Sequence, residues 1–219
     1  MHILTGNTGS RKIIALLQRY GWGRMWIDER PRLYAGERWG FDNGAFGWWV
    51  SGQTFNETLF LRRLERAYSV GVPYLAVVPD IVAGGERSLE FSLGWLDRLP
   101  RDWPWYIAVQ DGMTLQQIAP ILQPFAGIFL GGTVAWKGTA WYWADLAHRK
   151  KKLFHYGRAG TPRKLFHALE SGADSADSAG PLWTVEKMAE FVAAAMQGDR
   201  QVKFFGAQES ATCPGIWIP

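Results

Sequence analysis

Residues 74–80, YLAVVPD, form a continuously apolar run that ends on a single carboxylate. Residues 127–132, GIFLGG, repeat this pattern later in the chain and end on two glycines. Apolar runs without alternation are typical of strands that are buried on both faces, as in parallel sheets. The two runs therefore predict an α/β protein in which helices cover both faces of a sheet.

Working outward from these runs, the sequence predicts eight strands, at 3–5, 25–28, 39–42, 74–80, 105–110, 127–131, 153–157 and 173–178. Helical patterns fall between most of them, at 11–20, 56–70, 88–99, 114–122, 139–149, 161–171 and 184–196. Asn56, Thr114, Thr139, Thr161 and Thr184 stand where helix N-caps belong. The second and third strands are joined by a segment that is too short and too rich in Pro and Gly for a helix. Eight alternating units favour a compact (β/α)8 TIM-like barrel over an open doubly wound sheet.

The chain of 219 residues is expected to form one catalytic barrel domain over 1–198, with a C-terminal extension over 199–219 that packs on the barrel or trails from it. Lys and Arg number 24 against 20 Asp and Glu, a mild excess that permits a polyanionic partner without requiring one. The single cysteine, Cys213, excludes an internal disulfide framework and a multi-cysteine zinc site. The sequence shows neither a membrane-length apolar run nor the order of a signal peptide, so we expect a cytoplasmic protein without membrane association.

Polar residues gather where the predicted strands end, which is where barrels place their chemistry. An Asp after a strand is, taken alone, at least as often a turn or cap residue. The informative signal is that five of the eight strands end in Asp, Gln or a glycine pair. The candidates are Asp42, Asp80, Gln110, Gly131, Gly132, His155, Arg158, Asp174 and Asp177.

These residue types suit glycosyl transfer without a metal or another cofactor. Two carboxylates can divide the work, one attacking or stabilising an oxocarbenium-like centre and the other managing the proton of the leaving group. A further Asp and a Gln can read the edge of a purine, and a glycine pair exposes backbone N–H groups to a carbonyl oxygen. Composition alone leaves this as one option among several.

In this order the motifs FDNGAF, VVPD, AVQDG, FLGGT and GADSADSA, from Phe41 to Ala179, resemble those of the tRNA-guanine transglycosylases. The resemblance implies that Asp177 is the nucleophile and Asp42 the acid/base beside the nucleobase. It implies that Asp80 and Gln110 read the guanine edge and that Gly131 and Gly132 donate to the base carbonyl. Asp174, three residues before Asp177, is expected to have a structural role. His155 is placed beside the substrate, although a satisfied core histidine is the alternative.

The sequence also departs from this family. The zinc subdomain of the tRNA-acting members, built from three Cys and one His, is absent, and Ala176 and Ala45 replace a Phe and a Gly of the motifs. The chain is therefore most similar to the phage-type DNA-guanine transglycosylases, which place a 7-deazaguanine base, such as a queuosine precursor, in DNA and protect it from restriction. DNA is the expected partner, in the host cytoplasm if the protein is viral. Three alternative functions remain: action on tRNA with a partner chain, base hydrolysis, and a non-catalytic nucleic-acid-binding subunit. The protein could form a homodimer or act with a partner subunit.

Basic and aromatic side chains after strand ends are expected to contact nucleic acid at the top of the barrel. The candidates for phosphate contact are Lys137, Arg158, Arg163 and Lys164, and those for base stacking are Trp48 and Trp136. For each of them, an exposed helix-face cation or a core tryptophan is the alternative. Other tryptophans lie within predicted elements and are expected to pack in the core, namely Trp26, Trp39, Trp95, Trp105, Trp141 and Trp143.

Overall fold

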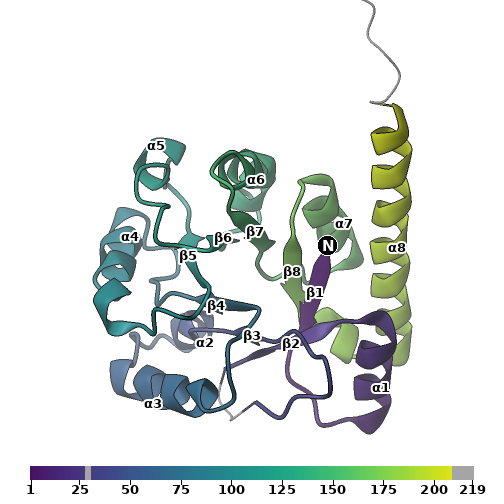
Figure 1. The fold of residues 1–219 in the computed structure, drawn as a ribbon, viewed down its shortest axis with the longest axis horizontal. Coiled ribbons are helices and arrows are strands. Elements are labelled where there is room, and N and C mark those ends of the chain that lie inside the picture. Colours follow the sequence, from purple (N-terminus) through teal and green to yellow (C-terminus); the bar gives the residue numbers. More distant parts are fainter. Residues whose placement is uncertain (28–30, 209–219) are drawn as a thin grey trace, which may run out of the picture.

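The computed structural model describes residues 1–27 and 31–208, with the side chains of 198–208 excepted. Eight parallel strands close into a barrel in sequence order, with β8 pairing back onto β1 (Figure 1). The strands are β1 His2–Thr5, β2 Gly23–Trp26, β3 Gly40–Phe41, β4 Leu75–Val77, β5 Trp105–Val109, β6 Gly127–Leu130, β7 Leu153–Tyr156 and β8 Ser175–Ser178. The predicted (β/α)8 barrel is confirmed, although most strands end one to three residues earlier than expected.

The helices surround the strands in Figure 1. They are α1 Arg11–Tyr20, α2 Ala45–Val50, α3 Glu57–Tyr68, α4 Glu86–Leu93, α5 Leu115–Ile118, α6 Ala140–Arg149, α7 Pro162–Glu170 and α8 Val185–Gln208. The side chains of Asn56, Thr114, Thr161 and Thr184 accept from the first turns of their helices, as predicted. Thr139 does not cap α6, since its hydroxyl donates to the Trp136 carbonyl and accepts from Trp143 Nε1.

Between β2 and β3 the described residues contain no helix, as the sequence predicted. A buried ion pair organises this connection. Arg24, the second residue of β2, donates from Nε and Nη2 to the two carboxylate oxygens of Glu37, each at 2.7 Å. Arg24 Nη2 also donates to the Arg32 carbonyl at 2.8 Å, so one guanidinium holds three segments together. A bidentate, charge-assisted pair of this kind fixes the geometry of the two side chains as well as stabilising them.

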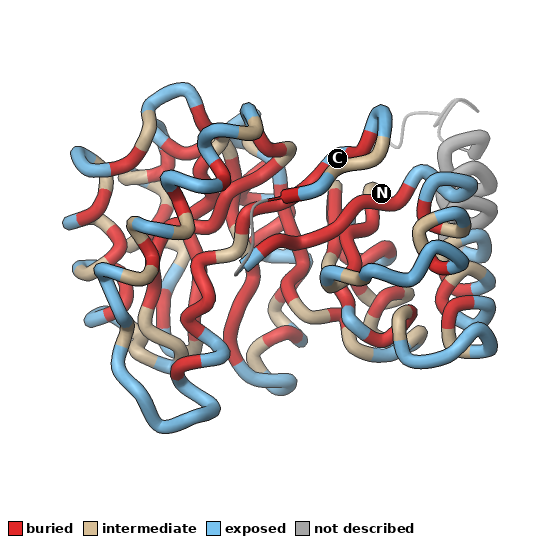
Figure 2. Tube along the Cα trace, turned by 90° about the horizontal axis from the view of Figure 1, so that it is seen from below, coloured by how far each residue is buried: buried red, intermediate tan, exposed pale blue. Residues whose placement is uncertain are grey.

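Two apolar layers make the core. Inside the barrel, the strands contribute Leu4, Met25, Leu75, Val77, Tyr106 and Ala108. The larger layer lies between the strands and the helices, and Figure 2 shows buried segments through the middle of the molecule with exposed segments toward its periphery. Trp26, Trp39, Trp95, Trp105 and Trp143 belong to this layer, as predicted, whereas Trp141 is 59 % exposed on α6 and the prediction that it packs was wrong.

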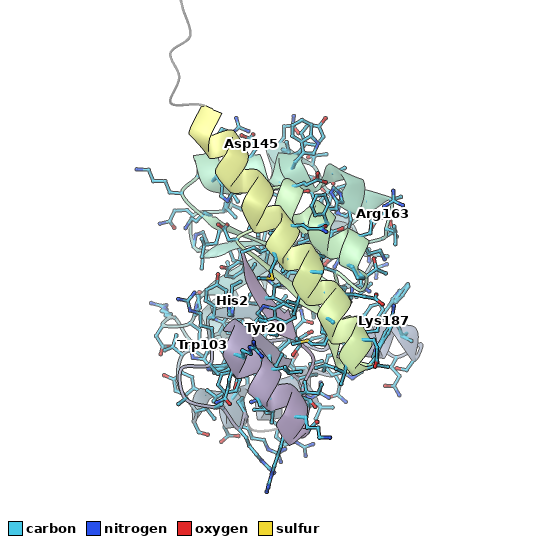
Figure 3. The ribbon with its side chains drawn as sticks, turned by 90° about the vertical axis from the view of Figure 1, so that its right-hand side faces the viewer. His2, Tyr20, Trp103, Asp145, Arg163 and Lys187 are labelled. Atoms are coloured by element: carbon cyan, nitrogen blue, oxygen red, sulfur yellow. The ribbon has the colours of Figure 1, made fainter. Side chains whose placement is uncertain are left out.

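The last described helix crosses the predicted domain boundary at 198. α8 runs without a break to Gln208, so the segment expected to trail from Asp199 is helical as far as that residue. In Figure 3 α8 lies along the side of the barrel, beside α7 and α1. Residues 209–219, and Cys213 with them, lie outside the described residues. Among the described helices, none has the length and apolarity needed to cross a membrane.

Candidate functional site

Two of the predicted carboxylates face one cavity at the carboxyl end of the barrel. Asp42 follows β3 directly and Asp177 is the third residue of β8, and both line a cavity of about 560 Å³. Apolar side chains form much of the remaining wall, among them Met25, Phe46 and Trp183. The cavity therefore combines two acids with flat and flexible apolar surfaces, a composition that suits a planar, partly polar ligand.

Asp177 is held as a carboxylate. His155 contacts Asp177 Oδ1 through Nε2 at 3.0 Å, and the backbone N–H of Arg158 donates to the same oxygen at 3.0 Å. Burial would raise the pKa of Asp177, but the hydrogen bond and charge of His155, with the Arg158 N–H and the charge of Lys137, outweigh burial and lower it. Among the described residues, both hydrogen bonds fall on Oδ1, so Oδ2 is left for attack on a substrate.

The pKa of Asp42 is displaced in the opposite direction from that of Asp177. Burial raises the pKa of Asp42 to about 6, and the nearby charges of Asp177 and Asp80 act in the same direction. The backbone N–H of Gly44, which donates to Asp42 Oδ1 at 2.8 Å, only partly offsets this. Asp42 can therefore gain and lose a proton near pH 6 while Asp177 stays ionised, a division that suits an acid/base and a nucleophile.

The two predicted readers of the base edge contact each other. Asp80 Oδ2 accepts from Gln110 Nε2, and Asp80 Oδ1 accepts from Asn43 Nδ2 at 2.7 Å. Asp80 and Gln110 are 5 % and 2 % exposed, and neither lines the cavity of Asp42 and Asp177. The backbone N–H of Ala83 lies 3.5 Å from Gln110 Oε1, so the segment after Asp80 covers the pair. Reading a base would require these two side chains to exchange their present hydrogen bonds for bonds to the ligand.

The glycine pair after β6 lies close to neighbouring side chains, and the second glycine also has a backbone conformation that favours glycine. A Cβ on Gly131 would lie 2.7 Å from Gln110 Nε2, and one on Gly132, whose φ is +72°, would lie 2.4 Å from both Asp111 Oδ2 and the Trp136 ring. The N–H of Gly131 already donates to the Val109 carbonyl at 3.0 Å. That N–H is therefore not free to bind a base carbonyl, and the donor role expected of Gly131 does not fit this structure.

His155 was expected beside the substrate, but the structure places it behind the nucleophile. The ring is fully buried, with Nδ1 2.8 Å from Ser175 Oγ and Nε2 on Asp177, and it stacks on Phe129. His155 is thus a positioning residue that orients Asp177. Asp174 has the structural role expected of it, because its Oδ2 accepts from the Phe154 N–H and contacts His148.

The four predicted phosphate contacts differ in their surroundings. Arg158 and Lys164 are partly buried and line a second cavity, whereas Arg163 is exposed on α7, near the edge of the molecule in Figure 3. Lys137 is only 4 % exposed, and its ammonium donates to the Gly157 carbonyl and lies over the Tyr156 ring. The expectation of an exposed rim cation is wrong for Lys137, because the 3₁₀ turn at Trp136–Thr139 turns this side chain inward.

Base stacking by Trp48 and Trp136 stays a prediction, and both rings pack against other side chains in the structure. Trp48 is 8 % exposed and packs on Phe55 and the Arg63 guanidinium, and Trp136 packs against Trp143. The exposed rings at the cavity mouths are Trp49, Phe46 and Trp183, at 52 %, 40 % and 68 %. Phe46 lies in the FDNGAF motif, so the sequence did contain a signal that this ring lies near the site. The side on which each of Trp48 and Trp49 lies is decided by α2, a helix that the sequence did not predict.

Comparisons with known proteins bear on the fold of this chain. No family model and no curated protein matches the chain. Among solved structures, the chain is similar to a chain of a cube-shaped, highly porous protein cage designed by fusing symmetric oligomeric domains, at 15 % identity and a TM-score of 0.55, over 96 % of this chain and 76 % of that one. It is also similar to a chain described as native KDPGal, at 12 % identity and a TM-score of 0.51, over 91 % and 95 % of the two chains. At these identities the similarity shows a shared barrel fold alone.

Proposed function

We propose that this chain is a DNA-guanine transglycosylase that exchanges guanine in DNA for a 7-deazaguanine base through a covalent Asp177–deoxyribose intermediate. One observation carries the proposal. Two carboxylates share a cavity of about 560 Å³, and their pKa values are displaced in opposite directions, downward for Asp177 and upward for Asp42. Base exchange needs this pair, a nucleophile that is always ionised and an acid that can give and take a proton.

In the first displacement, the target deoxyguanosine leaves the helix and its base enters the cavity, at a cost of about a few kcal/mol for unstacking. Asp177 Oδ2 attacks C1′ of the deoxyribose as the C1′–N9 bond breaks. The bonding electrons pass to the departing guanine, and Asp42 supplies the proton that neutralises it. An ester between Asp177 and C1′ remains, and Asp42 is left as a carboxylate.

In the second displacement, a 7-deazaguanine occupies the position that guanine has left. The Asp42 carboxylate removes the proton from N9, and N9 attacks C1′ as the bond to Asp177 breaks. Two inversions at one carbon retain the configuration. The ester must be kept from water, which would hydrolyse it to an abasic site, and Met25, Phe46 and Trp183 place apolar surface on the wall where a bound base would cover the cavity.

The test is incubation of the protein with duplex DNA, or separately with tRNA, and a 7-deazaguanine base, followed by digestion and mass spectrometry of the nucleosides. Modified deoxyguanosine supports the proposal, and modification confined to tRNA replaces it with the tRNA reaction. Guanine release without incorporation indicates a hydrolase. Binding without any product, at every substrate tested, indicates a non-catalytic subunit and contradicts the proposal.

The proton on Asp42 makes a specific pH dependence testable. Because guanine departs only with this proton, kcat/KM for guanine release should fall about tenfold per pH unit above about pH 6, the pKa of Asp42. In Asp42→Asn the reaction should slow at least 100-fold, and its descending limb near pH 6 should vanish. Lys137→Met removes a lysine whose pKa is lowered to about 7, and it should retain the limb even where its kcat/KM is reduced, because the limb belongs to Asp42. An unchanged limb in Asp42→Asn would reassign the acid.

The same substitution should stabilise the fold. A carboxyl whose pKa is raised on folding contributes stability below its ordinary pKa of 3.8 and loses it as the pH rises through about 6. At pH 8 the ionised, buried Asp42 therefore opposes folding. Asp42→Asn, which keeps an oxygen for the Gly44 N–H, should be more stable than the native chain at pH 8, by on the order of 2 kcal/mol. Urea denaturation at pH 5 and pH 8 measures this, and the gain should shrink at the lower pH.

A further inference from the structure

We propose that a second cavity beside the Asp42–Asp177 cavity binds a phosphate group of the nucleotide whose sugar Asp177 attacks. This cationic cavity has a volume of about 210 Å³, and its wall includes Lys137, Arg158 and Lys164 together with Thr133 and Trp49. The identity of the phosphate as that of a nucleotide rests on the function proposed above. The convergence of three cations on one cavity does not depend on that function.

Arg158 joins the two cavities. Its side chain lines both of them, while its backbone N–H donates to Asp177 Oδ1 at 3.0 Å. The residue has a φ of +53°, a left-handed conformation that a side chain other than glycine adopts at an energetic cost. Arg158 Nη2 donates to the Gly132 carbonyl at 3.0 Å, which fixes the guanidinium between the nucleophile and the second cavity. A phosphate bound there would belong to the same sugar that meets Asp177, or to its immediate neighbour.

Lys137 is the buried member of the three. Among the described residues its ammonium has one hydrogen bond, to the Gly157 carbonyl, and a cation–π contact with Tyr156 at 5.0 Å. An ammonium has three N–H donors, so donors remain for a ligand. Burial first, and then the like charge of Arg158, lowers the pKa of Lys137 to about 7. An anion in the cavity would oppose both effects and favour the charged form of the amine.

The cavity also has an excess of positive charge. Within the described part of the chain, none of Lys137, Arg158 and Lys164 forms a salt bridge with a carboxylate. Asp111 is the acidic residue of this wall, and both of its oxygens accept from Thr133, from the N–H at 2.8 Å and from the hydroxyl at 2.5 Å. Three cationic donors match a phosphate, which offers several oxygens and at least one full charge in a small volume.

The test compares ligands without a phosphate, with a terminal phosphate and with internal phosphodiesters. Binding of deoxyguanosine, dGMP and a trinucleotide with a central dG is measured by calorimetry at fixed ionic strength. The variants are Lys164→Gln, in which a partly exposed side chain changes and folding is not at risk, and Lys137→Met, which keeps the buried volume. Lys150→Gln removes the same charge from an exposed position just after α6, at the opposite end of the barrel, and controls for net charge.

In the native chain and in Lys150→Gln, at least one of the phosphorylated ligands should bind tenfold or more tightly than deoxyguanosine. The ratio of the dissociation constant of deoxyguanosine to that of the phosphorylated ligand should fall toward one in Lys164→Gln and in Lys137→Met. Preference for dGMP identifies a terminal phosphate as the source, and preference for the trinucleotide alone identifies an internal phosphodiester. A preference that is absent from the native chain, or equal in the native chain and Lys164→Gln, overturns the proposal. If the preference holds and no base exchange is found, the proposed function fails while the phosphate site stands.

Discussion

Replacing Asp177 with Asn is expected to abolish guanine release and base exchange, with a fall in rate on the order of 10⁴-fold or more. The amide cannot form the ester to C1′, because its oxygen is a far weaker nucleophile than a carboxylate oxygen. Asn still presents an oxygen at the position of Oδ1 to His155 Nε2 and to the Arg158 N–H, so the strand end should keep its geometry. Single-turnover release of labelled guanine from DNA measures the effect.

A second measurement tests the covalent step directly. Native protein quenched in acid during turnover without an incoming base should carry a DNA strand in ester linkage, seen as a mass increase or a band of reduced mobility. The Asp177→Asn protein should carry none. Asp174→Asn is the matched control, because this carboxylate lies three residues earlier and bonds Phe154 and His148 instead. Exchange in Asp177→Asn within tenfold of the native rate would show that Asp177 is not the nucleophile.

Replacing Arg24 with Met should destabilise the fold by about 3–5 kcal/mol, because it leaves the buried carboxylate of Glu37 without its partner. The two side chains are 3 % and 0 % exposed, so water cannot compensate. The connection between β2 and β3 also loses the bond from Arg24 Nη2 to the Arg32 carbonyl. Urea denaturation monitored by circular dichroism gives the free energy of unfolding.

Two further variants test that explanation. Arg149→Met breaks an ion pair with Asp145 whose side chains are 66 % and 59 % exposed, and it should cost less than about 1 kcal/mol. The double variant Arg24→Met with Glu37→Met removes both buried charges and should recover part of the lost stability. If Arg24→Met is no more destabilising than Arg149→Met, the ion pair does not hold the β2–β3 connection.

The barrel and the polar ends of its strands were predictable because both follow from local pattern. An apolar run such as 105–109 has to be buried on both faces, and a polar residue is tolerated only where the run ends. Asp42 and Asp177 both lie at such ends, and the closure of the sheet places the ends of β3 and β8 around one cavity. The helix α2, in contrast, was missed, because a run of six residues containing a glycine and two tryptophans gives little helical periodicity.

The sequence by itself determined the eight-stranded barrel and which residues stand at its carboxyl end. Only the tertiary structure decided what each of them does there. Asp80 and Gln110 are engaged with each other, His155 lies behind Asp177, and Lys137 is turned inward rather than lying on the rim. The physical reason is that burial and hydrogen-bond partners are set between residues some 20 to 37 positions apart, across neighbouring strands and loops. A local pattern places a residue at a strand end but does not choose its partner.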